Sequence, residues 1–104
     1  MTYVLVKLLE RTRLTSMPEI ARFYGIIIRI FFESGRHQLP HFHAAYGEYI
    51  ASYTIDPPAL LAGVMPRKQN NLIIAWAELY LEELLENWDL VSQNMQPNRI
   101  EGLR

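Results

Sequence analysis

His41 and His43 stand one residue apart in the stretch PHFHAAYGEYIASYTI, and they are two of the three histidines in this 104-residue chain. Side chains two residues apart on a β-strand point to the same side, so the two imidazoles would share one face of a sheet. Two imidazoles beside the guanidinium of Arg29 can cleave a phosphodiester, because one ring takes a proton, the other gives one, and the cation stabilises charge on phosphate. The pattern therefore predicts His41, His43 and Arg29 as candidate catalytic residues.

The same two imidazoles are also candidate metal ligands. A stable site for a divalent ion needs three or four ligands, and Glu33, His37 or Asp56 could complete one. A third interpretation requires no function, because two polar side chains on the wet face of a sheet are ordinary. We expect no cofactor, with a divalent metal held by His41 and His43 as the alternative.

A strand is predicted over residues 23–33, FYGIIIRIFFE, because β-branched and aromatic residues dominate it and Ser34-Gly35 follows. Its odd positions form a mixed face that carries Arg29 together with Phe23, Ile27 and Phe31. Its even positions are wholly apolar and are expected in the core: Tyr24, Ile26, Ile28, Ile30 and Phe32.

The stretch that holds the histidines is predicted to be a hairpin with Gly47-Glu48 as its turn, since glycine at the first turn position suits type II′. The core face would pair Tyr46 with Tyr49, Ala44 with Ala51, and Phe42 with Tyr53. The other face would pair Ala45 with Ile50, His43 with Ser52, and His41 with Thr54. Both histidines would then face solvent on the side of Arg29, with three candidate binding residues beside them: Ser52, Thr54 and Asp56.

Residues 59–64, ALLAGV, are expected to add a short strand, and one long helix is predicted over residues 66–94. Pro66 suits the first helical position, and Pro97 is expected to end the helix and leave a tail that docks through Ile100 and Leu103. The helix is predicted because its apolar residues recur at helical spacing: Leu72, Ile73, Trp76, Leu79, Tyr80, Leu84, Trp88 and Val91.

Two charged groups on this helix are candidate contacts. Arg67 and Lys68 at its start oppose the helix dipole unless an anion lies nearby, so they are candidate anion-binding residues. An acidic stripe is formed by Glu78, Glu82 and Glu86. Such helix faces are usually only solvated, although this one could dock a basic partner.

These elements predict an α+β domain in which one long amphipathic C-terminal helix covers one face of a small, mostly antiparallel sheet of three to five strands. Residues 17–104 would form this single domain. The opposite face keeps Phe23, Ile27 and Phe31 and needs a cover. Residues 1–16 are an N-terminal extension that could add a strand there, and a second copy of the chain could also cover the face.

Composition narrows the class of protein. The chain has no cysteine, which favours a cytoplasmic location, and its apolar runs are too short and too interrupted by charge to span a membrane. The net charge is −1, with +3 over residues 1–68 (eight basic, five acidic) and −4 over the rest (two basic, six acidic). This asymmetry is too weak to argue for DNA binding, whereas RNA stays open as a substrate.

From Met17 on, the sequence resembles a small prokaryotic family of unknown function, the domain of unknown function 4160. The resemblance rests on MPEIARFYGIIIRIFF, PHFHAAYGEY, GVMPRK and WAELYLEELLENWDL, and PHFH followed by YGEY is its most specific part. It implies a small cytoplasmic domain encoded beside another short protein, in an arrangement similar to toxin–antitoxin pairs.

We therefore expect a small cytoplasmic interaction protein, one component of a two-gene module, acting through the face of Arg29, His41 and His43. Its partner would be a small protein encoded nearby or a second copy of the chain. The alternative is a ribonuclease-like or metal-dependent enzyme that uses the same face.

Overall fold

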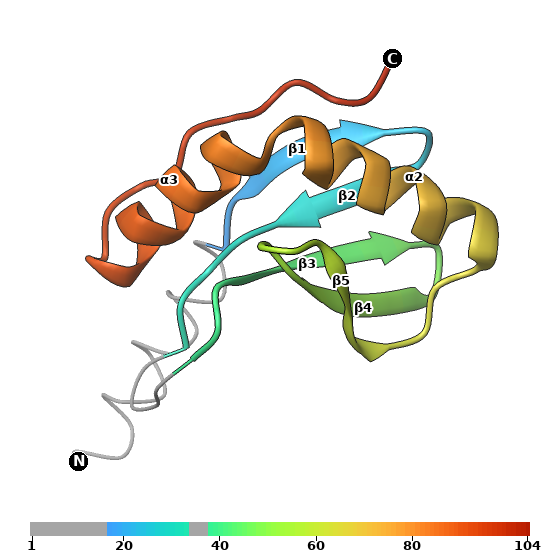
Figure 1. Ribbon diagram of the computed structural model, residues 1–104, viewed down its shortest axis with the longest axis horizontal. Coiled ribbons are helices and arrows are strands. Elements are labelled where there is room, and N and C mark those ends of the chain that lie inside the picture. Colours follow the sequence, from blue (N-terminus) through green and yellow to red (C-terminus); the bar gives the residue numbers. More distant parts are fainter. Residues whose placement is uncertain (1–16, 34–37) are drawn as a thin grey trace, which may run out of the picture.

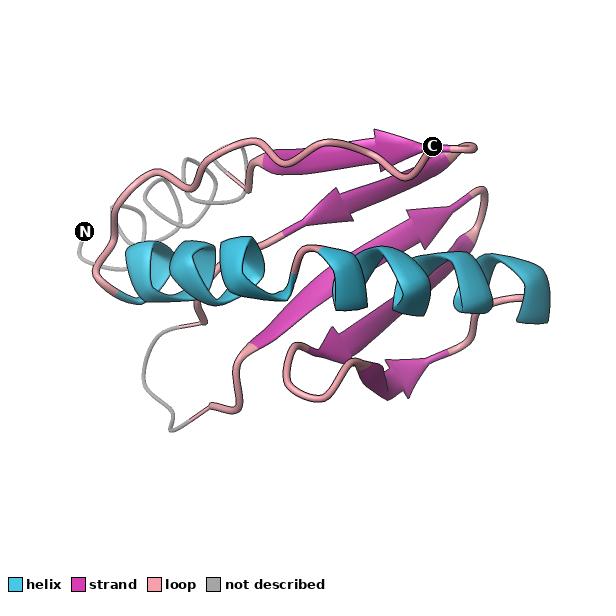
Figure 2. Cartoon of the chain, turned by 45° about the horizontal axis from the view of Figure 1, so that its top comes forward, coloured by secondary structure: helices cyan, strands magenta, loops and turns pink. Residues whose placement is uncertain are grey.

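The computed structural model describes residues 17–33 and 38–104. Five strands form one antiparallel sheet in the order of the chain: β1 (Glu19–Phe23), β2 (Ile26–Arg29), β3 (His41–Tyr46), β4 (Tyr49–Thr54) and β5 (Ala59–Gly63). Two helices follow, α2 (Arg67–Leu79) and α3 (Leu81–Ser92). The helices lie end to end along one side of the sheet, and the C-terminal tail runs back beside β1 (Figure 1, Figure 2). The predicted α+β class is confirmed, and the postulated cover from residues 1–16 lies outside the described residues.

Of the strand predicted over residues 23–33, only β2 (Ile26–Arg29) is a separate strand, and it forms the second half of a hairpin with β1. Tyr24 and Gly25 both have positive φ, 51° and 79°, as in a type I′ turn, and they separate β1 from β2. Tyr24 is therefore exposed, not in the core. Phe23 belongs to β1 and packs 5.4 Å from the ring of Trp76, so its predicted place on the uncovered face is wrong.

The β3–β4 hairpin has the predicted register at all six pairs, from His41 opposite Thr54 to Tyr46 opposite Tyr49. Gly47 adopts a φ of 57°, which a residue with a side chain would adopt only with strain. Side chains alternate between the two faces of the hairpin, so the positions of Phe42 and Tyr53 show which face is buried. Both residues are fully buried, and their rings stack with centres 5.4 Å apart. The short strand expected from ALLAGV is also present, as β5.

The prediction of a single long helix is wrong in one respect, because Tyr80, with φ −113° and ψ 31°, separates α2 from α3. Leu79, the last residue of α2, lies away from the buried stripe of Ile73, Trp76 and Ala77, and this predicted core residue is 68% exposed. Pro66 is the N-cap of α2, one position before its predicted place. At the other end, α3 stops ahead of Pro97, because Asn94 takes a left-handed φ of 63° and its backbone N–H donates to Val91.

The core lies between the sheet and the helices, and polar side chains anchor the tail to it. The indole N–H of Trp76 donates to the carbonyl of Glu101 at 2.7 Å, and the backbone N–H of Ile100 donates to Ile20 at 2.7 Å. Asn87, which is buried, bonds Asn98 in both directions. The predicted docking of the tail is thus confirmed, with Ile100 buried and Leu103 packed against the core.

A side-chain hydrogen bond to the sheet accounts for Asn70, one of the weak helix formers at the start of α2. The hydroxyl of Tyr53 donates to the side-chain oxygen of Asn70 at 2.8 Å. Burial raises the pKa of Tyr53 to about 12. Asn70 is partly buried and bonds a core tyrosine, which favours this residue here despite its low helix propensity.

Neither described helix combines the length and the apolar character that a bilayer crossing requires.

Candidate functional site

The side of the sheet away from the helices, the outer face, carries one polar row across the strands. The register places Arg29 opposite His43, and His43 opposite Ser52. The row continues to Glu19 on β1 and Ala62 on β5. The guanidinium of Arg29 and the imidazole of His43 therefore lie on the same face, as the sequence predicted.

A second row of the outer face is mainly apolar. Ile27 pairs with Ala45, and Ala45 pairs with Ile50, which is 67% exposed. The two rows border a shallow hollow of about 200 Å³, lined by Ile27, Arg29, Phe31, His43, Ala44, Ala45 and Ile50. Within residues 17–33 and 38–104, both helices lie on one side of the sheet (Figure 2), and the residues of this hollow belong to β2, β3, β4 and the segment after β2.

His41 is not on the solvent surface, so the prediction that both histidines face solvent is wrong for this residue. Only 8% of it is exposed, and its ring centre lies 5.0 Å from that of Trp88 on α3. The β2–β3 ladder ends at Arg29 and His43, so His41 has no strand neighbour on the β2 side and Trp88 packs there. The Nδ1 of His41 lies 2.8 Å from the carbonyl oxygen of Leu39, to which it donates.

His43 is half-buried and tightly held. Its ring stacks on Phe31 with centres 4.2 Å apart and planes 10° apart. Its Nε2 is sealed from solvent and has no hydrogen-bond partner in the described part of the chain. Burial and the nearby His41 lower the pKa of His43, and the charge of Glu33 partly opposes them. His43 therefore has a buried ring nitrogen without a hydrogen-bond partner among the described residues.

Glu33 completes a three-residue cluster with the two histidines. One ligand atom from each of Glu33, His41 and His43 lies within 4.8 Å of the other two. The two imidazole ring centres are 5.2 Å apart. Gln38 positions this segment, because its side-chain amide donates to the carbonyl of Glu33. Carboxylate and imidazole ligands at this spacing suit a divalent transition metal.

The remaining predicted residues do not join this cluster. Thr54 uses its hydroxyl to donate to the carbonyl of Pro57 at 2.6 Å. Asp56 is exposed in the turn that follows β4. Arg67 and Lys68 lie on a separate surface with Asn71 and Leu72. His37 is outside the described residues.

The aromatic walls of the cluster are not predicted by the sequence. The pattern assigns Phe31 only to an apolar patch, although its spacing of two from Arg29 and Glu33 places all three on one side. Trp88 is 47 positions from His41 in the chain, so no local pattern could have joined them. The sequence offers Glu33 only as one of three alternative ligands.

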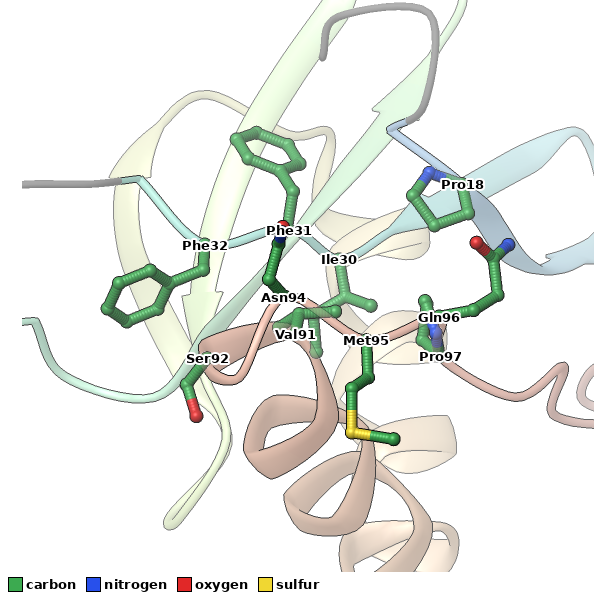
Figure 3. A pocket seen from close by; sticks show the side chains of 10 residues that line it. All are labelled: Pro18, Ile30, Phe31, Phe32, Val91, Ser92, Asn94, Met95, Gln96 and Pro97. Carbon is green, nitrogen blue, oxygen red and sulfur yellow. The ribbon is translucent and has the colours of Figure 1, made fainter.

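A larger hollow, of about 320 Å³, lies where β2 leaves the sheet beside the end of α3 (Figure 3). Phe31 and Phe32 leave the backbone in different directions there, toward His43 and Trp88 respectively. Its lining has no titratable side chain, so it offers no acid, base or ligand: Pro18, Ile30, Phe31, Phe32, Val91, Ser92, Asn94, Met95, Gln96 and Pro97. The Glu33, His41 and His43 cluster is therefore the stronger candidate for chemistry.

A family model described as domain of unknown function (DUF4160) matches residues 25–89, which run from the turn before β2 into α3. No curated protein and no solved structure matched. The matched segment contains the hairpin, both histidines, Glu33 and Trp88, and it is more than half of the chain. The chain therefore belongs to the family described as domain of unknown function (DUF4160).

Proposed function

We propose that this protein is a small cytoplasmic binding module that docks one partner protein on its outer face. The partner would be the product of a neighbouring gene, in a two-gene module of toxin–antitoxin type. The observation that carries the proposal is the exposure of Ile50 beside Arg29 on a face that no described element covers. The two-gene arrangement rests on the family resemblance, and the cytoplasmic location rests on the absence of cysteine.

The apolar row gives the partner its main contact. Ile50 exposes 67% of its surface and continues the row of Ile27 and Ala45. Contiguous apolar surface on a sheet is typical of interaction sites, because it gains free energy when water leaves it. The hollow of about 200 Å³ next to Ile50 is large enough for one or two side chains of a partner.

The charge of Arg29 indicates what else the partner presents. Glu19, in the same polar row, already binds Arg22 at 2.6 Å and Arg99 at 3.4 Å. No acidic residue in the described part of the chain forms an ion pair with Arg29. A carboxylate of the partner would bond this guanidinium strongly, because charge-assisted hydrogen bonds exceed neutral ones. The partner therefore presents apolar side chains flanking an acidic residue.

The ribonuclease-like alternative has weaker support. Acid–base cleavage needs two imidazoles that reach the same phosphodiester. His41 is 8% exposed and commits its Nδ1 to Leu39, while the Nε2 of His43 is hidden from solvent. This geometry favours docking over proton transfer to a substrate.

The test is co-purification of the full chain with the product of the adjacent gene, using two matched variants. Ile50→Asp places a charge in the proposed interface, and Leu79→Asp places the same charge on the helices at nearly equal exposure, 67% against 68%. We expect Ile50→Asp to weaken the complex by roughly 100-fold and Leu79→Asp to leave it unchanged.

Two results would overturn the proposal. One is a failure of the two wild-type proteins to form a complex, and the other is full retention of the complex by Ile50→Asp. If expression of the chain alone cleaves cellular RNA and His43→Ala abolishes the cleavage, the enzymatic alternative replaces docking.

A further inference from the structure

Three potential ligands converge where β2 leaves the sheet and β3 enters it. Glu33 lies four residues beyond β2, whereas His41 and His43 are the first and third residues of β3. Their ligand atoms fall within 4.8 Å of one another, although the loop between β2 and β3 separates the carboxylate from the imidazoles in sequence. Such convergence of one carboxylate and two imidazoles is the donor set of many zinc sites.

We propose that Glu33, His41 and His43 form a binding site for a divalent transition-metal ion, with Zn²⁺ as the best fit. The proposal goes beyond docking on the outer face, because the site needs no partner protein. It assigns the two histidines a joint role that neither solvent exposure nor acid–base chemistry explains.

The hydrogen bond of His41 fixes which nitrogen binds the metal. Nδ1 lies 2.8 Å from the Leu39 carbonyl oxygen, which can only accept, so Nδ1 carries the proton. Nε2 then keeps its lone pair for a metal ion. Metal-binding histidines are commonly oriented in this way, by donating the other ring N–H to a backbone carbonyl. Trp88, 5.0 Å away, holds the ring from the helix side.

The ring of His43 is held by stacking. Phe31 lies parallel to it at 4.2 Å, so the imidazole plane has little freedom. Its Nε2 is sealed from solvent without a hydrogen-bond partner in the described residues, and such a buried polar atom is costly. A metal ion bound at Nε2 would satisfy it.

The ligand spacing fits a small ion after a short adjustment. Zinc lies about 2.0–2.2 Å from nitrogen and oxygen ligands, which puts tetrahedral ligands roughly 3.3–3.5 Å apart. The upper limit of 4.8 Å therefore leaves at most about 1.3–1.5 Å to close, and rotation of the exposed Glu33 side chain can move its carboxylate by such a distance.

The donor types select the ion. Mg²⁺ and Ca²⁺ prefer oxygen ligands, so two imidazoles disfavour them and favour Zn²⁺, Co²⁺ or Ni²⁺. Three protein ligands leave one tetrahedral position open, as in zinc sites that bind a further group.

The experiment is calorimetric titration of Zn²⁺ into the full chain without an affinity tag, with Mg²⁺ as the competing ion. We expect one Zn²⁺ per chain, unaffected by Mg²⁺, and visible absorption bands of a four-coordinate site when Co²⁺ replaces it. His43→Phe preserves the stack on Phe31 but removes the ligand, and should weaken Zn²⁺ binding by roughly 100-fold. Glu33→Gln should weaken it by about 10-fold, whereas Glu48→Gln, in the distant hairpin turn, should bind like wild type.

Circular dichroism of each variant separates lost ligation from lost folding. The proposal is overturned if wild type binds no Zn²⁺, or if a folded His43→Phe variant binds it as tightly as wild type. Ile50→Asp distinguishes the two proposals, because it should lose the partner protein and keep Zn²⁺.

Discussion

The two faces of the β3–β4 hairpin carry opposite kinds of side chain on neighbouring residues. On the inner face, Phe42 and Tyr53 are fully buried and stack 5.4 Å apart beneath the helices. On the outer face, His43 lies between Arg29 and Ser52, and Ile50 is two-thirds exposed. The inner face stabilises the fold through buried apolar area, whereas the outer face leaves its chemistry available for binding. Variants on the two faces should therefore differ in what they disturb.

The largest expected effect contrasts two isoleucines on opposite faces. Ile28→Ala removes a fully buried side chain and should lower the free energy of unfolding by about 2–5 kcal/mol, because it leaves a cavity under the helices. Ile50→Ala should cost less than about 1 kcal/mol, because the side chain is already mostly in water. Urea unfolding of both variants measures the difference. Equal losses would show that the outer face is as tightly packed as the inner one.

A smaller effect concerns the buried hydroxyl of the inner face. Tyr53→Phe removes the hydrogen bond to Asn70 and should cost about 1 kcal/mol at neutral pH. In the wild type, burial raises the pKa of Tyr53 from 10.0 to about 12, so the unfolded chain loses this proton first. The contribution of protonated Tyr53 to the free energy of unfolding is therefore complete below pH 10 and declines as the pH rises toward 12. Unfolding midpoints measured from pH 9 to 12 should decline less in Tyr53→Phe, and identical slopes would contradict this assignment.

The smallest effect lies at the edge of the outer face. The hydrogen bond and charge of Arg22, together with those of Arg99, lower the pKa of Glu19 to about 2, against the opposing effect of burial. The pKa of Glu19 in the folded chain lies below the usual 4.5. Its ionised carboxylate therefore contributes fully to the free energy of unfolding above pH 4.5, and this contribution is lost as the pH falls toward 2. Glu19→Gln should therefore flatten the acid limb of the stability curve slightly, since exposed ion pairs contribute little. Stability measured between pH 5 and 2 tests this, and an unchanged acid limb would count against the pair.

The hairpin could be predicted from the sequence because its information is local. Alternation along 41–54 and a glycine at position 47 determine both the register and the faces. The β1–β2 turn escaped prediction because Tyr24 takes a positive φ, for which a tyrosine gives no signal. Likewise, the break at Tyr80 has no proline or glycine to mark it.

Only part of the candidate cluster could be predicted from the sequence, because the rest depends on tertiary packing. The spacing of His41 and His43 indicated a shared face, and that face does carry Arg29. The burial of His41 depends on Trp88, which reaches it through the tertiary packing of α3 against the sheet. Which of Glu33, His37 and Asp56 joins the histidines also depends on how the chain leaves β2, and the structure brings in Glu33.

The central claim is that the outer face binds while the inner face stabilises, and one pair of variants tests it most directly. The affinity of the neighbouring gene product should be measured by calorimetry for Ile50→Asp and Leu79→Asp, alongside their unfolding free energies. The account predicts near wild-type stability for both and a roughly 100-fold loss of affinity for Ile50→Asp alone. Equal affinities for the two variants would contradict it.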